Sequence, residues 1–109
     1  MPTKTDLLNL LSTDYTDGGT WVTSYNGVSV NGLLVKGKTG TAYASNEVFF
    51  PAAGSSVYGN VYAGDDGYYW SSTPYDADGA GSLNFFSGVQ YVNYGYRESG
   101  YSVRAVLAE

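Results

Sequence analysis

The chain has 109 residues, a net charge of −5 and a pI near 4.3, and it contains neither cysteine nor histidine. This length predicts a single domain spanning residues 1–109, and the acidic balance argues against nucleic acid and anionic membrane surfaces as partners, because both attract basic proteins. The missing residue types exclude disulfides, thiolate metal sites and histidine-based catalysis.

Residues 3–12 are predicted to form the one helix of the chain. Thr3 and Asp6 have the spacing of a capping box. Four leucines follow at helical spacing, which is typical of a helix face packed on a core. Residues 13–19 are rich in Asp, Thr and Gly and are predicted to be a turn after the helix.

Short strands are predicted for the rest of the chain, because β-forming residues alternate with Asn-Gly, Ser-Gly and Asp-rich stretches. The segment 20–40 is predicted to hold two or three antiparallel strands, with Lys36 and Lys38 on an exposed edge. The turns within it are placed at 26–27 and 31–32. Further strands are expected at 46–54, 68–73, 82–86, 89–94 and 101–107, with a loop at 55–67, a long turn at 74–81 and a hairpin turn at 87–88. No apolar run is long enough to span a membrane, and the N-terminus has no signal-peptide pattern.

The aromatic stretch YYWSST, residues 68–73, allows two interpretations. In the first, Trp70 and either Tyr68 or Tyr69 form the centre of the hydrophobic core. In the second, the indole of Trp70 is a platform on which a sugar ring stacks. The first is expected, because large rings dominate the cores of small domains.

The charged residues predict structure rather than chemistry. Two acidic turns, 65–67 and 76–79, do not fit the calcium-binding EF-hand loop, and acidic turns are common in any case, so no metal and no cofactor is predicted. Arg104 is expected to form an internal ion pair. Its candidate partners are Asp76, Asp78 and Glu98. Without histidine and without an S-x-x-K spacing the chain offers no nucleophile–base pair, and it is predicted not to be an enzyme.

Five segments occur in an order that resembles a known group of proteins: MPTKTDLLNLL, VFFPAAG, GYYWSSTP, SLNFFSGVQYV and YSVRAV. The series resembles the Fibrobacter succinogenes major paralogous domain of gut Bacteroidetes surface proteins, and through it the C-type-lectin-fold variable proteins of diversity-generating retroelements. The resemblance covers almost the whole chain. It implies an α+β, C-type-lectin-like fold with one N-terminal helix, a small twisted antiparallel sheet and long irregular loops.

The resemblance also implies a location, an edge and a variable region. The location is the cell surface or the extracellular space. Family members usually have a strand before the MPT segment, so this chain is expected to lack the family's first strand, which leaves an open edge at 101–107 through which a homo-oligomer can form. The diversified residues of the variable proteins fall, in this chain, at about 74–101.

The stretch VQYVNYGYRESGYSVR, residues 89–104, is the candidate site for a ligand. Tyrosine combined with Ser, Gly and Asn is the composition of antibody binding loops, where the rings give contact area at low entropy cost. The other interpretation is that these tyrosines pack a glycine-rich core. The predicted ligand-binding residues are Tyr75, Asp76, Asp78, Tyr91, Asn93, Tyr94, Tyr96, Glu98 and Tyr101.

Three functions remain open from the sequence. A display module binds a protein through a tyrosine-rich surface, a glycan-binding module holds a sugar in a shallow groove, and a structural module of a larger adhesin binds no ligand. The resemblance to variable proteins favours the first, with a protein ligand as the partner.

Overall fold

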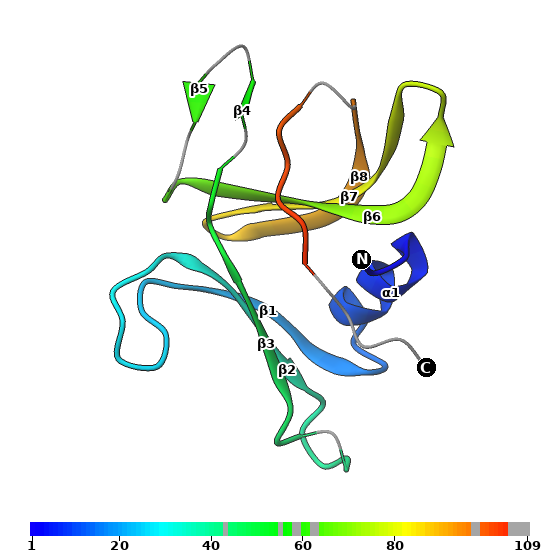
Figure 1. Cartoon of the computed structure of the whole chain (residues 1–109). Helices are drawn as coiled ribbons and strands as arrows, with labels where there is room; N and C mark the ends of the chain where they lie inside the picture. The colour runs from blue at the N-terminus through cyan, green and yellow to red at the C-terminus, as the bar shows by residue number, and fades with distance from the viewer. Residues whose placement is uncertain (43, 55, 58–59, 62–63, 97–98, 105–109) are drawn as a thin grey trace.

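The described residues of the computed structural model, 1–42, 44–54, 56–57, 60–61, 64–96 and 99–104, form an α+β arrangement (Figure 1). One short helix, α1 (Lys4–Leu11), precedes two three-stranded antiparallel sheets. The first sheet has the order β1-β2-β3 and the second the order β6-β7-β8. The strand bounds are β1 (Thr16–Val22), β2 (Gly32–Gly37), β3 (Glu47–Pro51), β4 (Ser56–Val57), β5 (Asn60–Val61), β6 (Asp66–Asp76), β7 (Gly79–Phe86) and β8 (Val89–Tyr96), with β4 and β5 paired as a short ribbon.

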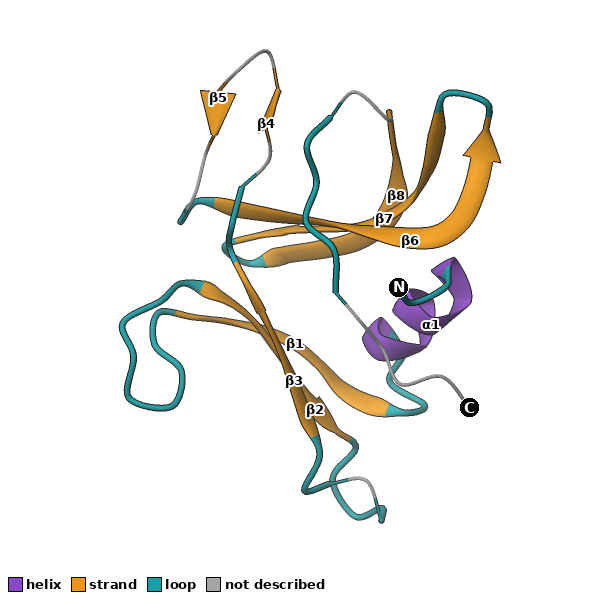
Figure 2. Cartoon of the chain, in the orientation of Figure 1, coloured by secondary structure: helices purple, strands orange, loops and turns teal. Residues whose placement is uncertain are grey.

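The predicted N-terminal helix is confirmed, including its capping box. The Thr3 hydroxyl accepts a hydrogen bond from the Asp6 backbone N–H at 3.1 Å, and the Thr3 N–H donates to the Asp6 carboxylate at 2.9 Å. Leu7 is fully buried and Leu10 and Leu11 pack on the core, whereas Leu8 is exposed. Figure 2 shows α1 beside the two sheets, where it covers one end of the core.

The core lies between the two sheets and is centred on three rings. Phe50 of the first sheet meets Tyr69 of the second edge-on at 5.1 Å, and Tyr69 stacks on Phe85 at 6.1 Å. The Tyr69 hydroxyl donates a hydrogen bond to the carbonyl of Pro51 at 2.9 Å, so its one polar atom is satisfied. Tyr69 is therefore the core ring of the YYW segment, and the expectation that Trp70 is central is wrong. Trp70 follows Tyr69 in the same strand, and adjacent side chains in a strand face opposite sides.

The first sheet differs from its predicted outline in three places. The predicted turn at 31–32 is wrong, because Gly32 is the first residue of β2 and pairs with Val22 and Pro51. β1 starts within the predicted turn, because a register shift between Thr16 and Gly19 brings this glycine-rich stretch into the ladder early. β2 is the central strand, so Lys36 does not decorate an edge but lies opposite Glu47 of β3. The turn at Asn26-Gly27 is confirmed, since both residues have positive φ and Tyr25 pairs with Val28.

The second sheet is longer than predicted because β6 and β7 continue into the expected long turn. Only residues 77–78 separate the two strands, and register shifts around Pro74 let the hairpin bend sharply. Ser87-Gly88 forms the predicted hairpin turn, with Gly88 at a φ of 82°.

The C-terminal segment runs along the outer edge of β6. The backbone of Ser102 accepts from the Trp70 N–H at 2.9 Å and donates to the Tyr68 carbonyl at 2.8 Å, in a single parallel bridge. Residues 101–104 therefore form no strand of their own, and residues 105–107 of the predicted strand lie outside the described residues. Among the described strands none pairs with the outer edge of β8, so the open edge is at β8.

Arg104 closes this segment over the core by contacts that the sequence did not indicate. Its guanidinium donates to the carbonyl of Phe49 at 3.2 Å and lies 5.3 Å from the centre of the Phe50 ring. The expected ion pair with Asp76 or Asp78 is not among its observed contacts, and Glu98 lies outside the described residues. Nothing in the described part of the chain forms a helix of the length and apolarity that a membrane crossing requires.

Two adjacent phenylalanines of β7 allow a test of which face of the strand packs on the core. Phe85 has 0% of its surface exposed and Phe86 has 39%. Phe85→Ala is expected to lower the free energy of unfolding by about 3–5 kcal/mol, because it leaves a cavity between the sheets. Phe86→Ala is expected to cost about 1 kcal/mol or less. Urea denaturation of both variants measures the difference, and equal losses would contradict this assignment of the two faces.

Candidate functional site

Strand β8 is an edge strand without the features that usually protect an edge. Its eight residues, Val89–Tyr96, include no charged residue and no proline. Natural edge strands commonly carry lysine, proline or a bulge that discourages a further strand from pairing. The opposite edge of the sheet is different, because β6 is bridged by Gly54 and by Ser102. Within the described part of the chain, no strand pairs with the outer edge of β8.

Three tyrosines gather at one end of this edge and are called here the tyrosine cluster: Tyr75, Tyr94 and Tyr96. Tyr75 stacks on Tyr94 with ring centres 4.1 Å apart and planes 6° apart, and Tyr96 meets Tyr94 edge-on at 6.4 Å. Their side chains are 59%, 41% and 56% exposed, respectively. The cluster is therefore an ordered aromatic surface that faces solvent.

The bend of the β6–β7 hairpin and two glycines bring these rings together. Gly81 lies opposite Tyr94 in the β7–β8 register, and Gly79 lies opposite Tyr96. Neither position has room for a side chain, since a Cβ at Gly79 would come within 2.3 Å of the Gly95 carbonyl and one at Gly81 within 2.8 Å of the Ser71 hydroxyl. The bend at Pro74 then carries Tyr75 across β7 to Tyr94.

The predicted ligand-binding residues of β8 are divided between the two faces of the second sheet. A Cβ on Gly81 would point toward Lys4 of α1, at 3.3 Å, so Tyr94, its partner in register, faces the helix side. Tyr91 and Asn93 alternate with Tyr94 along β8 and face the other side. The odd spacing between Tyr91 and Tyr94 was the signal in the sequence that these rings could not share one flat surface.

Tyr101 belongs to the framework on the second face. Its half-buried ring stacks on Tyr68 at 4.9 Å and packs against Trp70 at 4.5 Å. The ring also lies directly over Gly95, where a Cβ would come within 2.3 Å of it. Tyr101 was predicted to face a ligand in solvent, and this prediction is wrong because its ring packs against Tyr68 and Trp70. The sequence did not single out Gly95, because the need for its missing side chain arises only when residues 95 and 101 meet.

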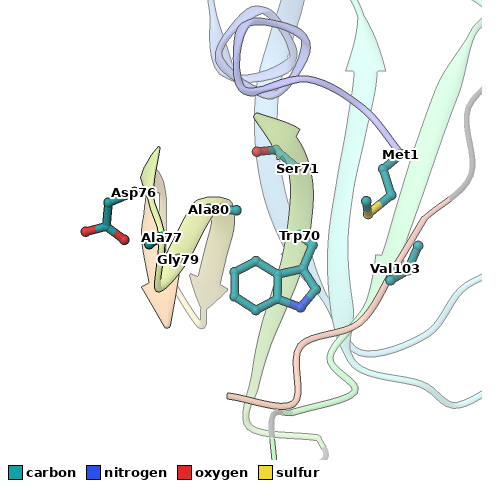
Figure 3. Close-up of a pocket in the computed structure, with 8 residues that line it drawn as sticks. All are labelled: Met1, Trp70, Ser71, Asp76, Ala77, Gly79, Ala80 and Val103. Carbon is teal, nitrogen blue, oxygen red and sulfur yellow. The ribbon is translucent and has the colours of Figure 1, made fainter. Parts of the chain in front are cut away.

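The two predicted acidic residues lie at the β6–β7 hairpin. The Asp76 carboxylate accepts a hydrogen bond from the Asp78 backbone N–H at 2.8 Å, and both residues are exposed. Asp76 lines a hollow of about 380 Å³ whose wall includes the indole of Trp70 (Figure 3). No three acidic side chains of the described residues gather closely enough to hold a metal ion. Glu98, the remaining predicted residue, lies outside the described residues.

Burial raises the pKa of three tyrosines in and beside this framework, Tyr68, Tyr69 and Tyr101, above the ordinary value of 10.0. The unfolded chain releases these protons near pH 10.0, whereas the folded chain retains them to higher pH. The three tyrosines therefore contribute stability that is complete below pH 10.0 and is lost as pH rises through the raised values.

We expect the free energy of unfolding to fall above pH 10.0 more gently in Tyr101→Phe than in the unchanged protein, because the variant has one fewer such phenol. Urea denaturation at a series of alkaline pH values, with the phenolate absorbance followed in parallel, measures this. An identical alkaline loss in the two proteins would contradict the role given to Tyr101.

Residues 18–106, which include most of the first sheet and all of the second, match the model of one protein family. This match begins within β1 and includes the tyrosine cluster, the hairpin and Arg104. Comparisons with curated proteins and with solved structures give no match. The chain belongs to the family described as domain of unknown function (DUF8237).

Proposed function

We propose that this chain is a non-catalytic binding module that recognises a protein ligand through the tyrosine cluster and the open edge of β8. The observation that carries this proposal is the contact of three exposed rings at the end of an edge strand without charged residues. Exposed aromatic side chains that already touch one another are typical of the energetic centres of protein interfaces.

The cluster is suited to binding because its rings are ordered before a ligand arrives. Tyr94 is held between Tyr75 and Tyr96, so its side chain has little rotational freedom left to lose. Immobilising a flexible side chain on binding costs about 0.5–1.5 kcal/mol, and a surface that is already rigid avoids that cost. Tyrosine also offers a hydroxyl at the edge of each ring for hydrogen bonds to the ligand.

The side chains of β8 lie on both faces of the second sheet, and this arrangement indicates how the ligand lies. An extended segment of the ligand that pairs with the outer edge of β8 would have Tyr94 and Tyr96 on one side and Tyr91 and Asn93 on the other. In this mode, known as β-augmentation, the backbone supplies affinity and the alternating side chains supply specificity. A flat ligand surface could contact only one of the two sets.

The finer identity of the module is part of the same proposal. The helix followed by antiparallel sheets, together with the order of the five segments, supports a C-type-lectin-like fold and the relation to the variable proteins of diversity-generating retroelements. A cell-surface or extracellular location follows from that resemblance. Finding a reverse transcriptase gene beside a near-copy of the segment that encodes residues 74–104 would support diversification, and an isolated gene would count against it.

The absence of catalysis in this proposal rests on composition. The chain has no histidine and no cysteine, which removes the usual general base and the strongest nucleophile. The tyrosine cluster itself contains only phenols.

Selection of a phage-displayed peptide library on the immobilised protein tests this function. We expect the selected peptides to bind roughly 30-fold more weakly to Tyr94→Ala or Tyr96→Ala, because each change removes an aromatic energetic centre. Biolayer interferometry measures the affinities, and thermal melting should change little in either variant, since the two side chains are 41% and 56% exposed and lie outside the core.

Phe86→Ala is the matched control. Phe86 is an exposed aromatic residue beside the turn of the β7–β8 hairpin, whereas Tyr94 and Tyr96 lie at the opposite end of that hairpin. Its affinity for the peptides should equal that of the unchanged protein. Peptides that bind all three variants equally would contradict the proposal, as would a large loss of stability in Tyr94→Ala. If the unchanged protein forms a stable dimer and Tyr94→Ala is a monomer, the partner at the β8 edge is a second copy of the chain.

A further inference from the structure

The stacked rings of Tyr75 and Tyr94 have a geometry that suits a covalent bond between them. Their centres are 4.1 Å apart and their planes differ by 6°, so the two rings lie face to face at close to the van der Waals distance. Oxidised phenols couple through the ring carbons beside the hydroxyl group. Because every carbon of a ring lies near its centre, the coupling carbons of the two rings are separated by little more than the ring spacing itself.

Both rings are accessible to an oxidant and can make the small movement that a bond requires. The two side chains are exposed, so water can take up the phenolic protons, and neither ring belongs to the hydrophobic core. Tyr75 comes from β6 and Tyr94 from β8, and β7 lies between these strands in the sheet. A bond between the rings would therefore tie β6 to β8 across the strand that separates them.

The other tyrosine pairs of the described residues are less suited to coupling. Tyr96 meets Tyr94 edge-on, with planes 87° apart and ring centres 6.4 Å apart, so their faces do not overlap. Tyr68 and Tyr101 stack at 4.9 Å but are half-buried. Burial raises the pKa of both these phenols above 10.0, which hinders the loss of a proton that accompanies oxidation. The pair with Tyr75 is thus the closest and the most accessible of the three.

We propose that Tyr75 and Tyr94 form a site of oxidative cross-linking, at which hydrogen peroxide and a haem peroxidase convert the two side chains into dityrosine. Each phenol gives up one electron and its hydroxyl proton and becomes a phenoxyl radical. A carbon–carbon bond forms between the coupling carbons, and the hydrogen on each of these carbons moves to the oxygen of its own ring. One molecule of peroxide takes up the two electrons and two protons and is reduced to two molecules of water.

Contact between the rings before oxidation favours coupling within one molecule. Two groups held in contact react as if each were present at a concentration far above any that a protein reaches in solution. The product closes a covalent loop between residues 75 and 94, in a chain that has no cysteine with which to form a disulfide. Closing such a loop restricts the unfolded chain and so stabilises the folded one. This proposal does not depend on the protein ligand proposed above.

The test is treatment of dilute protein with a haem peroxidase and a limiting amount of hydrogen peroxide. The expected product is a monomer that has lost the mass of two hydrogen atoms and shows dityrosine fluorescence. Cleavage before aspartate and after arginine should then release fragment 66–75 joined to fragment 78–97. A bond between Tyr68 and Tyr101 would instead join fragment 66–75 to fragment 98–104. The cross-linked monomer should also melt roughly 5–10 °C higher than the untreated protein.

Four variants assign the bond to its two rings. Tyr75→Phe and Tyr94→Phe should each form no cross-linked monomer, because phenylalanine keeps the ring but has no phenol to oxidise. Tyr96→Phe and Tyr68→Phe are the matched controls and should react as the unchanged protein does. The proposal is overturned if the monomer forms no dityrosine while the same mixture couples free tyrosine, or if dilute protein couples mainly between chains. It is also overturned if the bond maps to fragment 98–104, or if Tyr94→Phe cross-links normally.

Discussion

The burial of Tyr69 fixes the orientation of the whole second sheet. Its ring packs between Phe50 and Phe85, and its hydroxyl bonds to the carbonyl of Pro51 in the first sheet. Because a strand alternates its side chains, Tyr68 and Trp70 must then lie on the opposite face. There they meet Tyr101, which folds the C-terminal segment back over the sheet. One buried ring thus determines which aromatic residues remain available for ligands.

Glycines of β7 and β8 make room for aromatic packing on both faces of the second sheet. Gly79 and Gly81 leave space on β7 beside the rings of the tyrosine cluster, and Gly95 leaves space on the other face for the Tyr101 ring. The β6–β7 hairpin bends at Pro74, which brings Tyr75 to the cluster. A few small residues therefore arrange aromatic groups on both sides of a three-stranded sheet.

The proposed ligand of the tyrosine cluster follows from the shape of that surface. The tyrosine cluster is open and aromatic and lies at the end of an edge strand, so an extended polypeptide fits it by pairing with the backbone.

The sequence by itself determined the local features of this protein. The capping box at Thr3 and Asp6, the turns at Asn26-Gly27 and Ser87-Gly88, and the general course of the strands follow from interactions between neighbouring residues. The sequence also identified the tyrosine-rich region that holds the exposed cluster. Only the tertiary structure decided which of those rings meet, that Tyr69 rather than Trp70 enters the core, and that Arg104 lies over Phe50. These outcomes depend on the bend of the β6–β7 hairpin and on contacts between residues far apart in the chain, which local sequence patterns do not encode.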